Sequence, residues 1–336
     1  MKEAFFYATL ENGEVQCNLC CHRCKISPDK KGICRVRENR KGKFYSLVYG
    51  KPIAVHIDPI EKKPLFHFFP GSRSLSVATV GCNFRCKHCQ NFNISQSTEI
   101  EGEEYSPQEL VTIALNSGCK TISYTYTEPT IYFEFAFDIA EKAIKEGIKN
   151  IFVTNGFMTS LTLSKIKPYL HGANVDLKSF SNKFYREICG AKLEPVLESI
   201  QTMKDMGIWV EVTTLIIPTL NDSREELTEL ARFLASVGSE IPWHVSQFYP
   251  TYKMVDLYRT PKETLKMARE IGYKEGLRYV YCGNIPSDEG ENTYCFNCGK
   301  ILIKRYGFQI LENRLKEGKC PYCSANQDGV WLYEKE

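Results

Sequence analysis

Three cysteines on one short segment are the residues of this chain best suited to chemistry. Cys82, Cys86 and Cys89 lie in the sequence GCNFRCKHCQ, with three residues between the first two and two between the last two. A [4Fe–4S] cube is normally held by four cysteine thiolates. Three thiolates would leave one iron without a protein ligand, and that iron could bind a small molecule and pass an electron to it.

S-adenosylmethionine could chelate such an iron through its amino nitrogen and carboxylate oxygen. Its sulfonium would lie beside the cluster, and one electron would break a carbon–sulfur bond. The products are methionine and a 5′-deoxyadenosyl radical that abstracts hydrogen from a substrate, while the protein positions the cofactor and excludes competing reactions.

Two alternatives remain for the triplet. Zinc prefers four ligands, of which His88 could be the fourth under strain, and a disulfide would leave one thiol over.

The C-terminal cysteines form two C-x2-C pairs in a chain that has 15 cysteines in all. Four thiolates at this spacing predict a structural zinc ribbon or rubredoxin-like knuckle, for zinc or a single iron. Such a site helps to fold a tail that is too short to build its own core. The predicted ligands are Cys295, Cys298, Cys320 and Cys323.

A less regular group of cysteines precedes the triplet and predicts a second four-thiolate site. Zinc is the first choice for it, and an auxiliary [4Fe–4S] cluster is the competitor. Cys21 and His22 are possible substitutes for one of the ligands. The predicted ligands are Cys17, Cys20, Cys24 and Cys34. The isolated cysteines, Cys119, Cys189 and Cys282, are expected to be small buried hydrophobic residues.

Apolar runs alternate with amphipathic stretches between residues 73 and 285. The runs are rich in β-branched and aromatic residues and short enough to be buried strands. They read SLSVATVG, TISYTYT, NIFVTNG, GANVDLK, WVEVTTLIIP, WHVSQFYP and RYVYCGN. The helices predicted between them start at 107, cover 131–145, 194–206 and 222–233, and run from 261 towards 276. A strand–helix unit repeated six or seven times predicts a parallel sheet.

Polar residues fall at the predicted carboxyl ends of these strands, and this favours an open (β/α) barrel over a doubly wound sheet. Barrel enzymes carry their active site at that end. Strand ends are also polar simply because loops are polar, so the argument depends on the coincidence of several residues. They are Glu128, Asn155, Asp176, Lys178, Thr213, Thr214, Gln247 and Asn284.

The predicted organisation is an α/β chain in three parts. A Cys-rich metal-binding module with its lead-in covers 1–70, a partial, TIM-like (β/α) barrel covers 71–288, and a zinc-ribbon-like module covers 289–336.

The net charge is only +3 and basic residues are spread out, which argues against nucleic-acid binding. Apolar stretches long enough for a membrane span and a signal-peptide core are both missing, so a cytoplasmic protein is expected. Phosphate-loop, dinucleotide and nucleophile-elbow patterns are missing too.

The cysteine triplet resembles the signature of radical SAM enzymes. The segment GCNFRCKHCQNFNISQ is similar to the branch that contains pyruvate formate-lyase (glycyl-radical enzyme) activating enzymes. It is more similar still to the group named the AmmeMemoRadiSam-system radical SAM protein. The similarity covers nearly the whole chain, through CNLCCHRC, GIC, SYTYTEPTIYFE, VTNGF, VDLKSF, EVTTLIIPTLNDS, VYCGN and DGVW. This resemblance implies a radical SAM barrel.

The resemblance also implies roles for residues around the cofactor. The three cysteines match the cluster ligands, and the candidate contacts to S-adenosylmethionine are His88, Gln90, Glu128, Asn155, Asp176 and Lys178. Glu128 stands where the family contacts the methionyl amino group, which a carboxylate can bind by charge-assisted hydrogen bonds. Asn155, Asp176 and Lys178 match segments around the ribose and carboxylate. His88 stands where the family has an aromatic residue near adenine.

An activase-like radical SAM enzyme is therefore the predicted function, with a protein glycine or a small metabolite as hydrogen donor. A low-potential electron donor such as ferredoxin or flavodoxin is implied, and other AmmeMemoRadiSam-system proteins are candidate partners. Gln90 and Asn91 differ from the activase fingerprint after the last cysteine, which argues against pyruvate formate-lyase itself as the substrate. The alternatives are modification of tRNA or other RNA, and a non-catalytic metal–sulfur scaffold.

Overall fold

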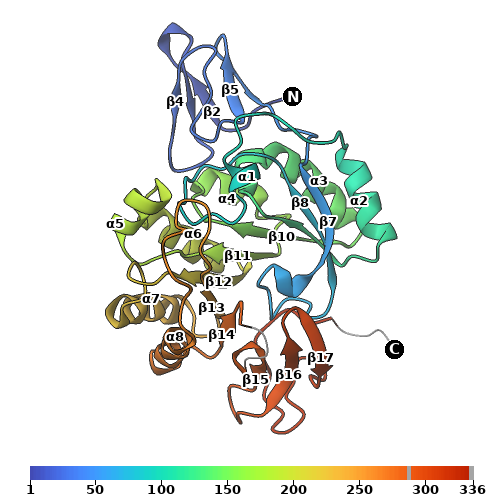
Figure 1. The fold of residues 1–336 in the computed structure, drawn as a ribbon. Coiled ribbons are helices and arrows are strands. Elements are labelled where there is room, and N and C mark those ends of the chain that lie inside the picture. Colours follow the sequence, from blue (N-terminus) through green and yellow to red (C-terminus); the bar gives the residue numbers. More distant parts are fainter. Residues whose placement is uncertain (286–288, 333–336) are drawn as a thin grey trace.

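An eight-stranded sheet forms the centre of the protein in the computed structural model, which describes residues 1–285 and 289–332 (Figure 1). Seven strands pair parallel to one another in chain order. They are β8 (Arg73–Ala78), β9 (Thr121–Tyr124), β10 (Lys149–Thr154), β11 (Gly172–Asp176), β12 (Trp209–Ile216), β13 (Trp243–Gln247) and β14 (Val280–Gly283). All seven predicted apolar runs are therefore strands.

The eighth strand, β7 (Ala54–Pro59), pairs antiparallel with β8 and was not predicted. Its sequence AVHIDP has no continuous apolar run, and its residues His56 and Ile57 are exposed. Within the described residues β7 and β14 are the two edges of the sheet, each paired on one side. The sheet is thus open, which confirms the predicted α/β fold with a partial barrel.

Helices connect successive strands and pack on the outside of the sheet (Figure 1). They are α2 (Pro107–Asn116), α3 (Phe133–Lys145), α4 (Ser160–Ile166), α6 (Glu194–Asp205), α7 (Arg224–Val237) and α8 (Lys262–Lys274). At the start of α2, Ser106 and Glu109 form a capping box in which each side chain accepts from the other's backbone N–H. Three short turns accompany these helices: α1 (Phe92–Ser95), α5 (Asn182–Phe184) and the π-helical turn η4 (Tyr185–Cys189).

Several helix boundaries differ from the prediction by one to four residues, the largest difference being the end of α7 at Val237 instead of 233, and α4 was missed. The helix predicted from 131 begins at Phe133, because Pro129–Tyr132 forms a separate 3-10 turn, η3. Helix α7 begins at Arg224 because Ser223 is its N-cap, whereas Asp222 accepts a hydrogen bond from the Thr219 N–H. Helix α4 has only seven residues, which is too few for a clear helical period.

Two small sets of antiparallel strands lie at opposite ends of the molecule (Figure 1). The N-terminal set comprises β1 (Lys2–Glu3), β2 (Tyr7–Thr9), β3 (Val15–Cys17), β4 (Lys25–Ile26), β5 (Arg37–Arg40) and β6 (Lys43–Ser46). The C-terminal set comprises β15 (Thr293–Tyr294), β16 (Ile301–Tyr306) and β17 (Gln309–Asn313). The division into three parts stays a prediction, and its boundary at residue 288 lies outside the described residues.

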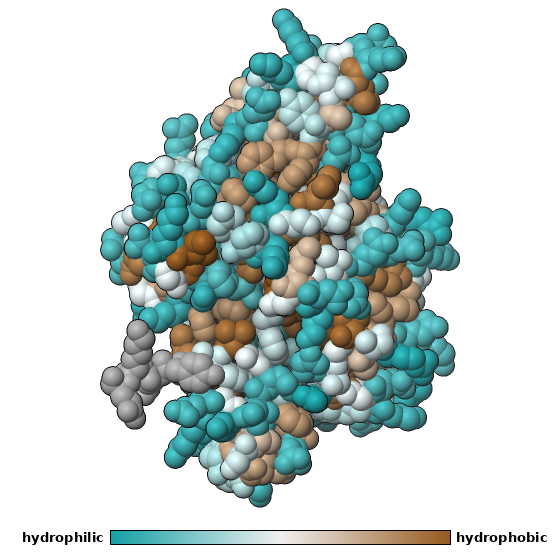
Figure 2. Space-filling model, turned by 180° about the vertical axis from the view of Figure 1, so that it is seen from behind, coloured by the Kyte–Doolittle hydropathy of each residue, from teal (hydrophilic) through white to brown (hydrophobic). Residues whose placement is uncertain are grey.

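Within the described residues, no helix is long and apolar enough to cross a membrane. Figure 2 shows the side opposite to Figure 1, where hydrophilic residues predominate and hydrophobic ones form small separate groups. Scattered apolar residues of this kind are normal on protein surfaces.

A buried histidine joins the C-terminal strands to the barrel. The two ring nitrogens of His67 lie 2.6 Å from the Asp328 carbonyl oxygen and 2.6 Å from the Tyr281 hydroxyl. The Arg305 guanidinium donates to the neighbouring Phe66 carbonyl at 2.9 Å. Burial lowers the pKa of His67 to about 4, so the ring is neutral near pH 7.

We expect His67→Gln to remove part of the acid sensitivity of folding. The His67 pKa is lower in the folded chain than the value of about 6.5 expected when unfolded, so the unfolded state takes up the proton first as the pH falls. Stability that is present above pH 6.5 is therefore lost between pH 6.5 and about 4. A shift of this size amounts to about 3 kcal/mol. Denaturant unfolding across this pH range should show a flatter profile for the variant, which cannot titrate at this position.

His56→Gln is the matched control, because His56 is exposed on β7. Its pH profile should follow that of the unmodified protein. A His67→Gln profile with the full slope would show that this ring does not contribute to acid unfolding.

Candidate functional site

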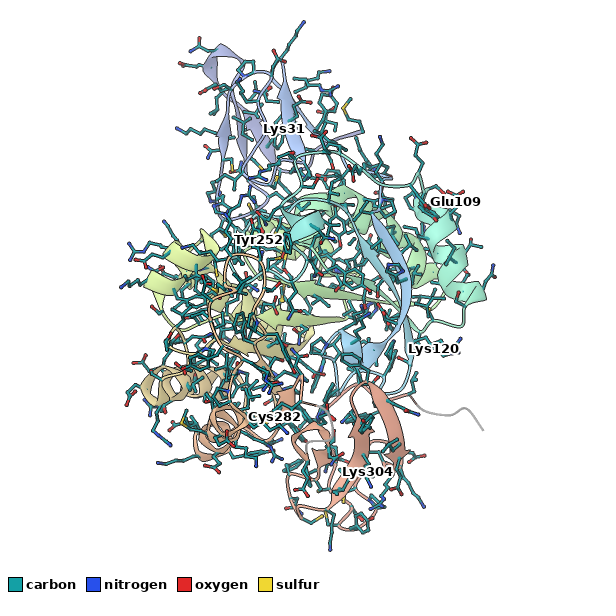
Figure 3. The ribbon with its side chains drawn as sticks, viewed as in Figure 1. Lys31, Glu109, Lys120, Tyr252, Cys282 and Lys304 are labelled. Carbon is teal, nitrogen blue, oxygen red and sulfur yellow. The ribbon has the colours of Figure 1, made fainter. Side chains whose placement is uncertain are left out.

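The cysteine loop leaves the carboxyl end of β8 and reaches α1. Backbone hydrogen bonds from Arg85 to Cys189 (2.8 Å) and from Lys87 to Ile188 (3.0 Å) hold one side of the loop against η4. The loop after β13 lies on another side, where the Phe92 and Tyr252 rings stack with centroids 4.5 Å apart; Tyr252 is labelled in Figure 3. The loop is thus held by other loops at the same end of the barrel.

Protein groups lie close to two of the three thiols of this loop, those of Cys82 and Cys89. The Phe84 N–H donates to Cys82 Sγ at 3.4 Å, and Cys89 Sγ lies 3.2 Å from Ser95 Oγ. Burial, with the nearby charges of Glu128 and the other two thiols, raises the pKa of Cys82 well above its ordinary value. Forming a thiolate here therefore needs a compensating positive charge, which a bound metal centre would supply.

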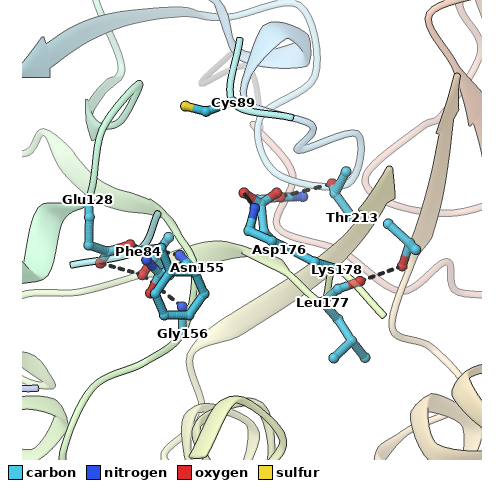
Figure 4. A network of polar contacts seen from close by, with 12 residues as sticks. Phe84, Cys89, Glu128, Asn155, Gly156, Asp176, Leu177, Lys178 and Thr213 are labelled. Atoms are coloured by element: carbon cyan, nitrogen blue, oxygen red, sulfur yellow. Dashed lines mark hydrogen bonds and ion pairs between the residues drawn. The ribbon is translucent and has the colours of Figure 1, made fainter. Parts of the chain in front are cut away.

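Glu128, after β9, is held by hydrogen bonds from its neighbours (Figure 4). Its Oε1 accepts from the Thr130 N–H (3.1 Å), the Thr130 hydroxyl (2.6 Å) and the Thr154 hydroxyl (2.7 Å). Its Oε2 accepts from the Asn155 N–H at 2.8 Å. Each carboxylate oxygen has two lone pairs, and Oε2, which accepts only this one hydrogen bond, can accept another. Burial raises the pKa of Glu128 despite these bonds, so a cationic partner at Oε2 would be favourable.

Asn155, after β10, lies directly against the cysteine loop. Its Nδ2 donates to Asn83 Oδ1 at 2.7 Å and lies 4.0 Å from Cys82 Sγ. Its Oδ1 accepts from the Phe157 N–H. The side chain therefore supports the loop, and its predicted contact to a ribose is not tested by this geometry.

Asp176 and Lys178, at the end of β11, form an ion pair of 2.9 Å (Figure 4). Burial disfavours the Lys178 ammonium, but the negative charges of Asp176 and of Cys86 and Cys189 in their thiolate forms raise its pKa above the ordinary value. Figure 4 places this pair on one side, Glu128 with Asn155 on the other, and Cys89 above both. The loop and three strand ends thus converge on one site.

His88 is buried, and its ring centroid lies 6.1 Å from that of Phe184. Burial and the charge of Lys178 lower the His88 pKa to about 3, so the ring is neutral. Its Nδ1 has no hydrogen-bond partner among the described residues. A neutral ring with an open nitrogen suits stacking or hydrogen bonding to a ligand. Gln90, by contrast, is exposed.

The other polar strand ends make structural hydrogen bonds. Thr213 Oγ1 donates to Asn174 Oδ1, and Thr214 Oγ1 donates to the Leu177 carbonyl. Gln247 donates to the Thr260 carbonyl at 2.6 Å, and Asn284 donates to the Gln247 carbonyl at 3.1 Å. The polar strand-end residues are thus of two kinds: some lie at the cysteine loop, and others make hydrogen bonds within the barrel. Thr213, Thr214, Gln247 and Asn284 are of the second kind.

One residue near the triplet, Cys189, could not be placed there from the sequence. Cys189 was expected to be only a small buried residue, and it is buried. The structure also brings its thiol beside that of Cys86, where it lowers the Cys86 pKa. This contact arises from the π-helical turn η4, which no spacing pattern reveals.

The C-terminal cysteines are grouped as the sequence predicted. The Sγ atoms of Cys295, Cys298, Cys320 and Cys323 all lie within 4.8 Å of one another. Cys295 and Cys323 are 3.6 Å apart, and Cys298 and Cys320 are 3.7 Å apart. Four thiolates around zinc at about 2.3 Å are separated by roughly 3.8 Å. The four residues therefore form a group that could bind a single metal ion.

We expect Cys298→Ser to reduce the metal content of the protein and to lower the thermal unfolding midpoint by about 5 °C or more, because a small four-thiolate module depends on a bound metal. Metal analysis and thermal unfolding test this. Cys119→Ala, which changes a cysteine far from the group in sequence, is the control and should keep the full metal content. Unchanged metal content in Cys298→Ser would rule out a metal site at these four residues.

The four N-terminal cysteines line one pocket, but their thiols are not grouped as closely as the C-terminal ones. Within the described residues, the C-terminal group alone brings three or more potential metal ligands within 4.8 Å of one another. Cys21 is outside the pocket lining and donates to the Met158 carbonyl at 3.0 Å. His22 lines the pocket, but its Nε2 lies 2.8 Å from the Asn83 carbonyl oxygen. The two possible substitutes thus have other partners.

The site geometry agrees with similarities to known proteins. A family model described as the radical SAM superfamily matches residues 76–234. An uncharacterized protein of Methanocaldococcus jannaschii is 45% identical over 335 residues, which are 98% of this chain and 100% of that protein. The chain belongs to the radical SAM superfamily. For this radical SAM protein, family membership implies a [4Fe–4S] cluster and S-adenosylmethionine.

Activating enzymes are among the relatives of this radical SAM protein. The pyruvate formate-lyase-activating enzyme of Clostridium pasteurianum is 23% identical over 212 residues, 59% of this chain and 88% of that enzyme. Among solved structures, Streptococcus suis SuiB bound to S-adenosylmethionine has a TM-score of 0.51 and 15% identity. The match covers 67% of this chain and 53% of SuiB, and it supports the fold alone.

Proposed function

We propose that this radical SAM protein is an activase-like enzyme that reductively cleaves S-adenosylmethionine and abstracts hydrogen from a protein glycine or a small metabolite. In this proposal Cys82, Cys86 and Cys89 hold the [4Fe–4S] cluster. The observation that carries it is the convergence of this loop with the ends of β9, β10 and β11. When bound, the cluster and S-adenosylmethionine would supply one electron and a 5′-deoxyadenosyl radical.

The residues at the site fit such a cofactor. The free acceptor position of Glu128 Oε2 suits a positively charged amino group. The Lys178 ammonium suits a carboxylate, and Asp176 holds it in place. The neutral His88 ring, with its unpartnered Nδ1, suits a base such as adenine. Asn155 positions the cysteine loop, and Gln90 remains a candidate contact on the exposed side.

A one-electron reductant must serve such an enzyme, and we propose a ferredoxin- or flavodoxin-like donor. The activating enzymes among the relatives support a protein substrate, and other AmmeMemoRadiSam-system proteins are the first to test. We also propose zinc at Cys295, Cys298, Cys320 and Cys323, because the separations of 3.6 and 3.7 Å suit four thiolates around one ion.

The first experiment measures cofactor cleavage. Anaerobically reconstituted and reduced protein should convert S-adenosylmethionine to 5′-deoxyadenosine and methionine, and the products can be quantified by chromatography. The same protein without reductant is the control. If no 5′-deoxyadenosine forms although the cluster content is full, the enzyme proposal is wrong and a non-catalytic scaffold remains.

The second experiment asks where the hydrogen comes from. Cells of the source organism are grown with glycine deuterated at Cα, and their extract is separated into macromolecules and small molecules. Deuterium in 5′-deoxyadenosine after incubation with the macromolecular fraction would support a protein glycine. Deuterium transfer from neither fraction would contradict abstraction from glycine.

A further inference from the structure

We propose that Cys17, Cys20, Cys24 and Cys34 hold a second [4Fe–4S] cluster, next to the loop that carries Cys82. Sequence spacing left zinc and an iron–sulfur cluster as alternatives for these four residues. The pocket, the separation of the thiols and the unpaired donors around them favour the cluster.

The four cysteines come from separate segments and line the same pocket. It contains about 330 Å³ of space that atoms do not fill, part of it open to solvent. Gly32 lies beside two of the thiols, since a Cβ on this residue would lie 3.9 Å from Cys34 Sγ and 4.0 Å from Cys24 Sγ. Four thiols therefore surround a space instead of packing against one another.

The separation of the thiols distinguishes this pocket from a zinc site. The C-terminal thiols lie within 4.8 Å of one another, as ligands of one ion must, and in residues 1–285 and 289–332 no other group of three or more does. Each thiolate of a [4Fe–4S] cluster binds a different iron, so its four ligands stand farther apart than those of one zinc ion. Among the described residues, neither the four N-terminal thiols nor those of Cys82, Cys86 and Cys89 include three within 4.8 Å of one another, so both sets lack the close grouping of a zinc site.

Two buried N–H groups at the pocket lack acceptors. Arg37 and Asn83 both line it, and Arg37 Nε and Asn83 Nδ2 have no hydrogen-bond partner among the described residues. Leaving a buried donor unpaired costs about 1–3 kcal/mol. Cluster and cysteine sulfurs accept hydrogen bonds from such groups, so these two donors are candidates to bond to the sulfurs of a bound cluster.

The same pocket adjoins the central cysteine loop. Asn83 lines the pocket and directly follows Cys82 in the chain. A Cβ on Gly81 would lie only 2.9 Å from the Cys34 carbonyl oxygen, so the two loops are in contact. The second cluster would therefore lie beside the first, with all four of its irons ligated by the protein.

Metal analysis of three full-length proteins, purified without oxygen, tests this proposal. The unmodified chain should contain about eight irons and about one zinc. Replacing Cys82, Cys86 and Cys89 together by Ala should leave about four irons, with the Mössbauer spectrum of a [4Fe–4S] cluster. Replacing Cys17, Cys20, Cys24 and Cys34 together by Ala should remove the other four or so. Cys21→Ala is the matched control and should keep all the iron.

The variant without the central triplet decides the question even if the N-terminal variant does not fold. Retention of a [4Fe–4S] cluster whose electron paramagnetic resonance signal does not change with S-adenosylmethionine supports the proposal. A complete loss of iron with about two zinc ions per chain would overturn it. So would a signal that changes with S-adenosylmethionine, because a fully ligated cluster offers no iron to that molecule. None of these outcomes depends on cofactor cleavage by the intact enzyme.

Discussion

Cys86→Ala should abolish reductive cleavage of S-adenosylmethionine while the barrel remains folded. Cys86 is buried in the loop after β8, and the change removes one of three proposed cluster ligands. Two thiolates cannot hold the cube in place of three. The loss should exceed the roughly 10–100-fold effect that is typical when only a group supporting a ligand is removed. Chromatography of 5′-deoxyadenosine measures the activity, and circular dichroism reports the fold.

Cys189→Ala is the matched comparison for this variant. Cys189 contacts Cys86 but is not a proposed ligand, so its removal should reduce cleavage by at most about 10–100-fold. Cys119→Ala should have no effect on cleavage. Full cleavage by Cys86→Ala would refute its assignment as a ligand, and equal total loss in Cys189→Ala would mean that Cys189 has a larger role than support.

Glu134→Ala should destabilise the protein by about 3–5 kcal/mol, because it leaves a buried arginine without its counter-ion. The Glu134 carboxylate accepts from both terminal nitrogens of Arg37 at 2.7 Å and from the Phe5 N–H at 2.6 Å. The side chains of Arg37 and Glu134 are 2% and 0% exposed. Arg37 is on β5 and Glu134 on α3, so this pair joins the N-terminal strands to the barrel. Urea unfolding measures the change in free energy.

Glu146→Ala, at the exposed residue directly after α3, is the control and should change stability by no more than about 0.5 kcal/mol. A second comparison replaces the pair by apolar residues, Arg37→Met with Glu134→Leu. This double variant should be more stable than Glu134→Ala, because no unpaired charge stays buried. If Glu134→Ala lowers the free energy of unfolding by less than about 1 kcal/mol, Arg37 must bond to water or to another group in the variant. The ion pair would then not be what holds the N-terminal strands to the barrel.

Local sequence patterns were sufficient for the main elements of the fold. The seven parallel strands follow from apolar runs, because buried strands need apolar residues on both faces. The start of helix α2 follows from Ser106 as its cap and Pro107 as its first residue, because both preferences are local. The edge strand β7 has no such pattern, since its pairing with β8 and the exposure of His56 depend on its place at the edge.

Only part of the candidate site could be predicted from the sequence. The triplet and the C-terminal pairs have spacings that metal centres impose on a short segment, and Glu128, Asn155, Asp176 and Lys178 follow strands. Which strand-end residues face a ligand was not predictable. Glu128 and Lys178 converge on the cysteine loop, whereas Thr214 and Gln247 bond to backbone carbonyls.

By itself, the sequence determined the order of the seven parallel strands and of five helices between them, the cysteine groups and the radical SAM resemblance, because each of these depends on residues that are neighbours in the chain. Only the tertiary structure decided that Cys189 contacts Cys86, that Glu134 neutralises Arg37, and that the N-terminal thiols surround a pocket beside Asn83. These contacts join residues far apart in the chain. Their distances depend on how the barrel and the N-terminal strands pack, and no local spacing records that packing.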